Sequence, residues 1–342
     1  MSSTEPVSVW DPVFKGDGQV AFLEKPVPSP GAGELLLQVN ANALCGSERG
    51  QFYRGASVTP GHEAVGTVVA VGTGTHTPLG TMGAVYLMDF CGACRSCRLG
   101  FTNQCLHKRG DMGFNRDGGY GRYELIHENI FFPVEKGFSA AEATLLLDVM
   151  GTGGHAVDRC RLFRADLESL LILGAGPIGL GVLAMAKIIL GPEVTVFVSD
   201  VIPYRLRLAE RLGGLPIDAT TGLTKNLARQ GLDCVDAAVD TSGKQAARQE
   251  AVKALAQRGV LVCVGHGEAI TLDVTTDLIA AERSVIGSEY FGYSEFAANL
   301  PRLRVHRSYL KQIITHRFSI DQVQQAFELF FGGETGKVVI EQ

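Results

Sequence analysis

The sequence lacks an excess of positive charge. Its 342 residues carry 31 lysines and arginines against 36 aspartates and glutamates, a formal net charge of −5. A mildly acidic chain is a poor partner for nucleic acids and anionic membranes, which are bound through clustered positive charge. The glycines show no three-residue period, so a collagen-like fibre is excluded. With 46% hydrophobic and 20% charged residues, the composition also excludes disorder and permits a sizeable core.

A targeting segment and a membrane span are also missing from the pattern. The start, Met1 to Asp17, is polar and has no basic run followed by an apolar core, so we expect no signal peptide. The window Leu170 to Leu190 is apolar, but glycines and a proline near its front indicate a buried strand, a turn and a helix. We therefore expect a cytoplasmic protein, in which eight cysteines indicate metal binding or catalysis before disulfides.

Residues 1–152 are predicted to form a domain of short β-elements broken by glycine. In Glu34 to Leu44 every second residue is apolar, which is typical of a strand with one buried face. A second strand is predicted at Ala64 to Gly72. Ser139-Ala-Ala-Glu142 is a capping box in front of an apolar run, and it predicts the start of a helix.

After Arg161 the pattern changes to strands that alternate with helices. The predicted strands are Ser169–Leu173, Val194–Ser199, Cys234–Asp240 and Gly259–Gly265. The predicted helices are Ile178–Ile189, Tyr204–Leu212 after Pro203, and Gln245–Gln257. Such alternation favours a parallel, doubly wound sheet, which we place at residues 153–289 of an α/β protein. Residues 290–342, with a helix at Ile320–Phe331 and a last strand at Lys337–Glu341, are expected to return to the first domain.

A glycine-rich turn, Gly174-Ala-Gly176-Pro177-Ile178-Gly179, lies between a predicted strand and a predicted helix. Its glycines permit a tight turn, the approach of a pyrophosphate and close packing of helix on strand, while the helix N-terminus faces the anion. Asp200 ends the next strand, where a carboxylate can bind an adenosine ribose and repel a 2′-phosphate. The pattern predicts an NAD site. Arg205, a further candidate for cofactor binding, and Arg207 leave NADP open, although both are interpreted mainly as a solvated helix face.

Four cysteines follow the pattern Cys91-x2-Cys94-x2-Cys97-x7-Cys105. Four thiolates this close together suit a closed tetrahedral zinc site, which has no position for water and is therefore structural. An iron–sulfur site and a redox pair are the alternatives, because ligand type alone does not exclude iron. The other apolar-flanked cysteines are interpreted as small buried residues: Cys160, Cys234 and Cys263.

Three further groups could form an open metal site. Cys45 lies at the end of one predicted strand, His62 and Glu63 precede another, and Asp148 ends the capped helix. A thiolate, an imidazole and a carboxylate are suitable zinc ligands that leave a fourth position for water or substrate. Each residue could equally serve packing or a loop, since spacing in sequence does not show convergence in space.

The whole chain resembles the zinc-dependent medium-chain alcohol and polyol dehydrogenase family. The matching motifs are Cys45-Gly-Ser47, Gly61-His62-Glu63-Ala-Val-Gly66, the four cysteines, Gly118-Gly119-Tyr-Gly121-Arg-Tyr123, Asp148 with Thr152, and the turn at Gly174. The resemblance implies a GroES-like catalytic domain with a structural zinc lobe at about 91–105, a Rossmann domain, and a cleft between them. It also implies catalytic zinc on Cys45, His62 and Asp148, with Glu63 as a supporting carboxylate or alternating ligand.

The reaction implied is the reversible oxidation of an alcohol, with hydride transfer to NAD and zinc acidifying the hydroxyl. Ser47 would relay the proton, Thr152 and Ile178 would back the nicotinamide, and Glu48 would orient His62. One departure is Gly50, where many members have a histidine that ends the proton relay. The proton exit through water, Glu48 or His155 therefore stays open.

The leading hypothesis for the substrate is a secondary alcohol of polyol or sugar-like type. The alternatives are a primary-alcohol or threonine-type dehydrogenase of the same fold, and a cofactor-binding homologue without turnover. Candidate residues of the substrate pocket are aromatic: Phe52, Tyr53, Phe90, Phe114 and Tyr290. By analogy with the family we expect a homodimer or homotetramer.

Overall fold

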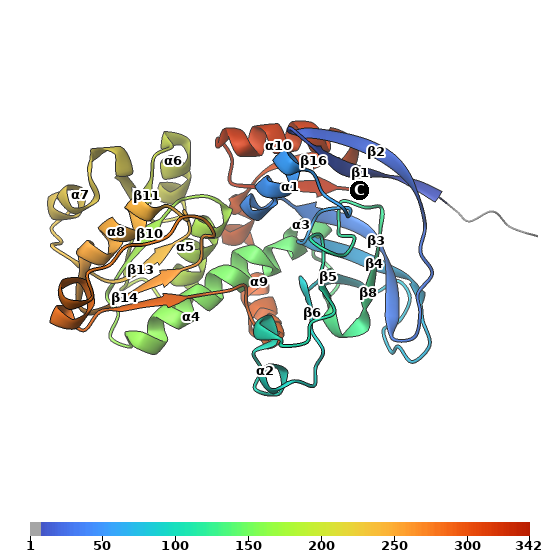
Figure 1. Ribbon diagram of the computed structural model, residues 1–342, viewed down its shortest axis with the longest axis horizontal. Coiled ribbons are helices and arrows are strands. Elements are labelled where there is room, and N and C mark those ends of the chain that lie inside the picture. The colour runs from blue at the N-terminus through green and yellow to red at the C-terminus, as the bar shows by residue number, and fades with distance from the viewer. Residues whose placement is uncertain (1–7) are drawn as a thin grey trace, which may run out of the picture.

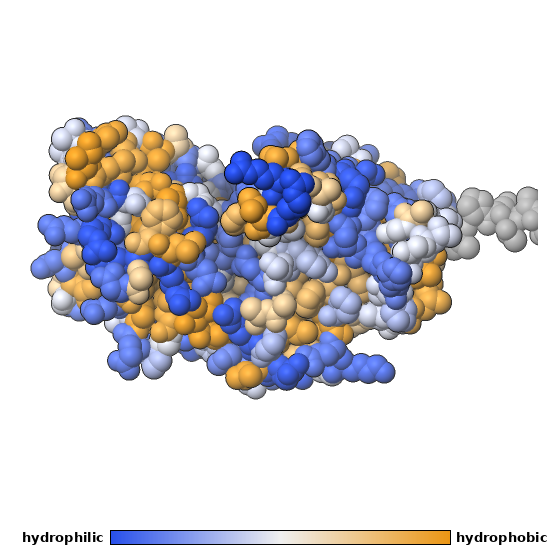
Figure 2. Space-filling model, turned by 90° about the horizontal axis from the view of Figure 1, so that it is seen from below, coloured by the Kyte–Doolittle hydropathy of each residue, from blue (hydrophilic) through white to orange (hydrophobic). Residues whose placement is uncertain are grey.

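The computed structural model describes residues 8–342, which form two large sheets at opposite ends of an elongated molecule (Figure 1). Residues 1–7, part of the polar start considered above, lie outside the described residues. None of the helices in the described part of the chain is long and apolar enough to cross a membrane. On the face in Figure 2, hydrophilic and hydrophobic residues are interspersed.

The first sheet has seven strands, in the order β16-β17-β3-β4-β5-β9 with β8 paired to β3. Its strands are β3 (Glu34–Ala43), β4 (Ala64–Val71), β5 (Met82–Val85), β8 (Tyr123–His127), β9 (Phe131–Pro133), β16 (Ile314–Ser319) and β17 (Lys337–Glu341). The alternation predicted from Glu34 is confirmed, because Leu35, Leu37 and Val39 are buried in the core. The last residues of the chain thus pair with β3, near its end at Ala43.

The second sheet is parallel throughout, in the order β12-β11-β10-β13-β14-β15, and confirms the doubly wound α/β architecture. Its strands are β10 (Ser169–Leu173), β11 (Thr195–Asp200), β12 (Leu215–Asp218), β13 (Val235–Asp240), β14 (Leu255–Cys263) and β15 (Ser284–Gly287). Its helices are α5 (Pro177–Ile189), α6 (Pro203–Arg211), α7 (Leu223–Arg229) and α8 (Gln245–Ala254). The predicted extension of α8 to Gln257 is wrong, because the buried Leu255 already pairs with Val235 of β13.

Shorter elements complete the fold. They are the hairpin β1 (Ser8–Gly16) and β2 (Gln19–Pro26), the pair β6 (Met88–Asp89) and β7 (Gly110–Asp111), and the helices α1 (Arg49–Arg54), α2 (Arg95–Arg98), α9 (Phe296–Leu310) and α10 (Val323–Gly332). The helix predicted from Ile320 begins instead with a 3-10 turn, Ile320–Gln322, and becomes α10 only at Val323.

The connection between the two sheets is a chain of short helical turns. Ser139 caps α3 (Ala140–Ala143) through the predicted capping box, and its hydroxyl accepts the Glu142 amide. A 3-10 turn and a π-type turn, Asp148–Thr152, then lead into α4 (Gly153–Phe163). The prediction that Asp148 ends the capped helix is therefore wrong, because Asp148 is the first residue of this wide turn. Turns of this π-type are rare and are frequently found at functional sites.

Glu124 is an exception to the pairing of buried charges. It lies on β8 opposite Leu37, is about 1% exposed, and neither carboxylate oxygen has a hydrogen-bond partner. Burial, with a smaller contribution from the charge of Asp117, raises the pKa of Glu124 to about 8. Because an unfolded glutamate ionises near its ordinary pKa of 4.5, the unfolded state loses the proton first as the pH rises.

We expect the substitution Glu124→Gln to make the protein less sensitive to alkali. Between about pH 4.5 and 8 the carboxyl of Glu124 is ionised in the unfolded state but protonated in the folded state, so rising pH favours unfolding of the wild type. The variant has no carboxyl to ionise at this position. The free energy of unfolding of the variant relative to wild type should therefore rise by about 4 kcal/mol across this window. Denaturant titrations at pH 5 and pH 8 measure it, with the exposed Glu135→Gln as control. A difference that does not change with pH would contradict the prediction.

Candidate metal centre and cofactor cleft

Four potential metal ligands from distant parts of the sequence converge between the sheets. Cys45 follows the end of β3, whereas His62 and Glu63 precede the start of β4. Because β3 and β4 are antiparallel, with Asn42 opposite Ala64, these ends are neighbours. Asp148 enters from the π-type turn. One ligand atom of each of the four residues lies within 4.8 Å of the others, and all four are buried.

Hydrogen bonds fix the orientation of the imidazole and the carboxylate. The His62 Nδ1 atom lies 3.2 Å from Glu48 Oε1, which leaves Nε2 facing Asp148 at 3.7 Å. The contact with Glu48 that the family resemblance implies is therefore present. Glu48 is itself held, because its Oε2 accepts the Tyr120 hydroxyl at 2.9 Å. Thr152 donates its hydroxyl to Asp148 Oδ1 at 3.2 Å. Such outer contacts orient the ligands of a metal before it binds.

Lys337, which the sequence analysis missed, belongs to the same centre. It is the first residue of β17, is fully buried, and forms an ion pair with Glu63. Burial alone would lower the pKa of Lys337, but the carboxylates of Glu63 and Asp148 outweigh it and raise the pKa. A lysine at the head of the apolar run Lys337–Ile340 was the available signal, but only the pairing of β17 with β3 shows its partner.

The donor set fits a divalent cation. Burial and the charge of Asp148 raise the pKa of Cys45, although hydrogen bonding to His62 opposes them. Burial would lower the pKa of His62, yet its hydrogen bonds to Asp148, Cys45 and Glu48 raise it well above its usual value. Glu63 Oε2 is buried and has no hydrogen-bond partner. A thiol, an imidazole and two carboxylates around one point, with Lys337 as a balancing cation, are ligands that zinc accepts.

The four cysteines predicted to form a closed site also lie together. Their four sulfurs lie within 4.8 Å of one another, and the 3.5 Å between the sulfurs of Cys94 and Cys97 is too long for a disulfide. Backbone amides point at the sulfurs, including that of Leu106 toward Cys94 at 3.5 Å. Hydrogen bonds from the backbone at Cys97 and Leu106 lower the pKa of Cys94 to about 6. The backbone therefore favours a thiolate at Cys94, whereas burial and the neighbouring cysteines raise the pKa of Cys97 to about 12.

The glycine turn has the geometry that its three glycines predict. Gly174 has φ +95°, a conformation that other residues rarely adopt. A Cβ at Gly179 would overlap the carbonyl oxygen of Gly174, so close helix–strand packing requires glycine there. A Cβ at Gly176 would meet only Arg205, at 4.0 Å, so this side of the turn is open to a ligand. Pro177 is the first residue of α5, whose N-terminus faces the open side.

Asp200 ends β11 beside the same turn. Its Oδ2 accepts the Ala175 amide at 2.7 Å and its Oδ1 accepts the Ile202 amide at 2.9 Å. The carboxylate therefore also fixes the backbone of the glycine turn, which sequence reasoning did not foresee. Arg205 is partly buried and lies 3.9 Å from Asp200. Its interpretation as a solvated face is wrong, because the side chain turns inward toward this carboxylate.

Of the aromatic residues predicted for the substrate pocket, some lie beside the metal centre and others belong to separate aromatic clusters. Phe114 lies 5.0 Å from His62 between ring centroids, and Tyr290 is buried close enough for the charge of Asp148 to raise its pKa, after the larger effect of burial. Phe52 belongs to a different aromatic cluster, with Phe14 and Phe327.

Phe90 packs on Tyr86, 5.9 Å away between ring centroids, and Tyr53 lies beside Phe331. Ser47 is exposed on the turn after Cys45. Of the isolated cysteines, Cys160 is buried as predicted and Cys263 is half-buried. The prediction for Cys234 is wrong, because it is exposed.

Comparison with known proteins agrees with this geometry. Residues 31–136 match the model of the alcohol dehydrogenase GroES-like domain, and residues 152–342 match that of the glucose dehydrogenase C-terminus. An uncharacterised zinc-type alcohol dehydrogenase-like protein of Escherichia coli K12, YphC, is 30% identical, covering 95% of this chain and 96% of the relative. An L-threonine 3-dehydrogenase of Saccharopolyspora erythraea is 30% identical, covering 93% and 94%.

The fold is also that of a solved structure. An alcohol dehydrogenase (rspB) from Escherichia coli CFT073, complexed with NADH, superposes with a TM-score of 0.88 at 22% identity, over 98% of this chain and 99% of that one. Together with the two domain matches and the relatives of nearly equal length, the sheets and the donor sets identify the family. The chain belongs to the zinc-dependent medium-chain alcohol dehydrogenases.

Proposed function

We propose that the protein transfers a hydride from a secondary alcohol, of polyol or sugar-like type, to NAD and produces a ketone. The observation that carries this proposal is the convergence of Cys45, His62 and Asp148 in a buried cluster between the two sheets. When bound, zinc supplies a Lewis acid that acidifies the alcohol hydroxyl, and NAD supplies the hydride acceptor.

The residues around the cluster hold it in a working geometry. Glu48 and Tyr120 fix the ring of His62, and Thr152 fixes the carboxylate of Asp148. Phe114 packs 5.0 Å from the ring of His62, and the buried Tyr290 lies near Asp148. Preorganisation of this kind lets a site stabilise developing charge without rearranging during the reaction.

Ser47 is the group that we propose takes the proton from the alcohol, since it is exposed two residues after Cys45. Position 50, where a histidine would end the relay, is glycine. Glu48 is buried and already bonded to His62 and Tyr120, which makes it a poor exit. An exit by water from Ser47 is therefore the path that we propose.

The cysteine lobe and the glycine turn would hold the structural zinc and the cofactor. Cys91, Cys94, Cys97 and Cys105 would hold a structural zinc, since a closed set of four thiolates leaves no position for substrate. Thr152 and Ile178 would back the nicotinamide, and Asp200 would select NAD over NADP, with Arg205 beside it.

A threonine-type activity is the second candidate, favoured by the 30% identity to an L-threonine 3-dehydrogenase. We further propose a cytoplasmic homodimer or homotetramer that acts on small molecules. Strand β15 has one unpaired edge among the described residues, and an edge of this kind can pair with a second copy.

We expect the wild-type protein to contain about two zinc ions per chain and Asp148→Asn about one. Loss of the charged ligand should lower turnover by about 100-fold or more while NAD binding persists. Metal analysis by plasma mass spectrometry, an NADH-formation assay and NAD titration measure the three quantities, with the exposed Asp158→Asn as matched control. Unchanged turnover would remove Asp148 from the mechanism, and a wild-type count of one with the cysteine lobe filled would favour the non-catalytic alternative.

The cofactor preference is expected to depend on Asp200. In the wild type, repulsion of a 2′-phosphate should make kcat/KM with NAD at least about 100-fold higher than with NADP. Asp200→Ser removes both the repulsion and the ribose acceptor, so this ratio should fall about tenfold or more. Asp218→Ser is the matched control, because Asp218 ends the neighbouring strand β12 in the same way. Comparable efficiency with both cofactors in the wild type would defeat the argument.

A further inference from the structure

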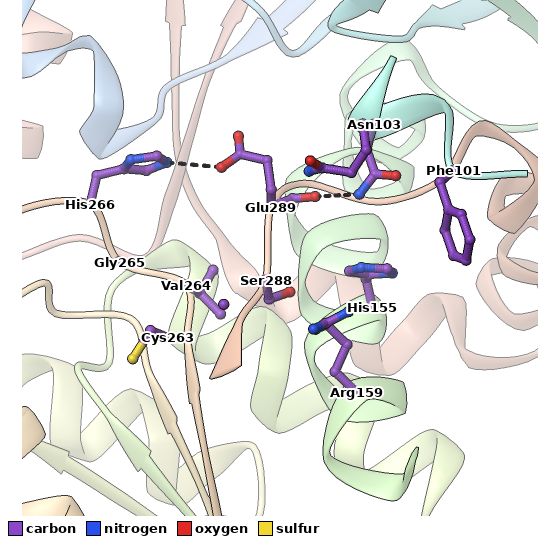
Figure 3. A pocket seen from close by; sticks show the side chains of 12 residues that line it. Phe101, Asn103, His155, Arg159, Cys263, Val264, Gly265, His266, Ser288 and Glu289 are labelled. Carbon is purple, nitrogen blue, oxygen red and sulfur yellow. Dashed lines mark hydrogen bonds and ion pairs between the residues drawn. The ribbon is translucent and has the colours of Figure 1, made fainter. Parts of the chain in front are cut away.

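Two features of the described residues stand outside the proposed function. One is a cavity of about 660 Å³ between the cysteine lobe, α4 and the ends of β14 and β15 (Figure 3). Its wall carries the cation Arg159 but also the carboxylate of Glu289, which lies 3.6 Å from His266. A wall with both charges selects no class of ligand. The other feature is the buried ion pair of Lys337 with Glu63 at the metal centre.

The ion pair is enclosed and its lysine is anchored from two sides. Both side chains are fully buried, and Lys337 Nζ donates to Glu63 Oε1. Lys337 begins β17, which pairs with β3 near the end of that strand at Ala43. The residue before it packs against α6, since a Cβ at Gly336 would meet Leu208 at 2.9 Å. The backbone therefore brings the ammonium to a fixed place beside the carboxylate.

Glu63 has a second oxygen that the lysine does not bind. This atom, Oε2, is buried and has no hydrogen-bond partner among the residues that the structure describes. One carboxylate oxygen of Glu63 lies within 4.8 Å of a ligand atom of each of the other three members of the cluster. The carboxylate is thus within reach of the point on which they converge. As a fourth protein ligand it would complete a closed tetrahedral set, which leaves no position for substrate.

The charges of the centre balance in two separate pairs. The thiolate of Cys45 and the carboxylate of Asp148 together neutralise a divalent cation, while Lys337 neutralises Glu63. Without the ammonium, Glu63 would be a buried charge with no partner. Buried charges in proteins are paired or coordinate a metal, so the metal ion is the alternative partner of this carboxylate.

We propose that Lys337 is a positioning residue that holds Glu63 away from the catalytic metal and so keeps the fourth coordination position free for the alcohol. The ammonium and the metal ion compete for one carboxylate, and the ion pair decides in favour of the ammonium. The inference rests on the proposed function and deepens it, because it names the residue on which the open position depends. Removal of the ammonium should bring Glu63 onto the metal and close that position.

The test uses the cobalt(II)-substituted protein and imidazole, a neutral ligand for an open coordination position. Imidazole changes the visible spectrum of cobalt when it binds, and the closed cysteine site has no position for it. The wild type should show a saturable change. In Lys337→Met the apparent Kd for imidazole should rise about tenfold or more, because Glu63 then occupies the position in most molecules.

A double variant shows whether the effect runs through Glu63. In Lys337→Met/Glu63→Gln the imidazole affinity should return to that of the wild type, because no charged carboxylate is left to close the position. Lys311→Met is the control, since Lys311 is exposed at the end of α9, and it should bind imidazole as the wild type does. Cobalt content and thermal unfolding are measured for each protein.

The zinc-loaded enzyme provides a second measurement. Because Glu63 would compete with the alcohol for one position, Lys337→Met should raise KM for the alcohol about tenfold or more and change kcat far less. A loss of general structure would instead lower kcat and would not be reversed by the second substitution.

Each outcome decides the proposal. Unchanged imidazole affinity in Lys337→Met, or a loss that persists in the double variant, would overturn it. So would a wild type that holds two cobalt ions and does not respond to imidazole. With one cobalt ion and no response, the proposed function and the role of Lys337 fail together.

Folding and turnover separate the remaining cases. If Lys337→Met does not fold, Lys337→Gln takes its place. Failure of both to fold while the double variant folds would assign Lys337 to stability alone and overturn the proposal. If the imidazole pattern holds but no alcohol is oxidised, the proposed function is wrong and the positioning role of Lys337 stands.

Discussion

The structure depends on the burial of several anionic groups around one point. A thiol, two carboxylates and an imidazole converge in a buried cluster, and Lys337 is the cation that faces them. Isolated charges in a protein interior are costly unless they are paired or coordinate a metal. The centre is therefore a place where metal binding and folding are coupled, because a cation relieves the repulsion that the fold imposes.

The fold produces this convergence by joining three independent segments. The antiparallel pairing of β3 and β4 sets the thiol beside the imidazole, and the π-type turn before α4 directs Asp148 toward both. The C-terminal return places Lys337 against Glu63. Since each segment is anchored in a sheet or against a buried helix, the ligands are positioned by rigid elements, which is the condition for a precise site.

The parallel sheet carries the glycine turn and the other segments that lie at the ends of its strands. Its strands end at one edge, where the glycine turn, Asp200 and the segments after β14 and β15 gather. Helix α4 begins directly after the turn that carries Asp148, and Thr152 donates its hydroxyl to that carboxylate.

The sequence by itself determined the features that depend on local patterns. Alternation from Glu34 predicted β3, the capping box at Ser139 predicted α3, and the glycine turn predicted its own geometry, because neighbouring residues impose these structures. The four cysteines were predictable for the same reason, since they lie within one short lobe.

Only the tertiary structure decided what depends on long-range contact. The ion pair of Lys337 with Glu63 joins residues 274 positions apart, and the inward turn of Arg205 depends on Asp200 across a strand end. Asp148 needed a wide turn that no capping signal announces. Such contacts are set by the packing of whole elements, which a one-dimensional pattern does not encode.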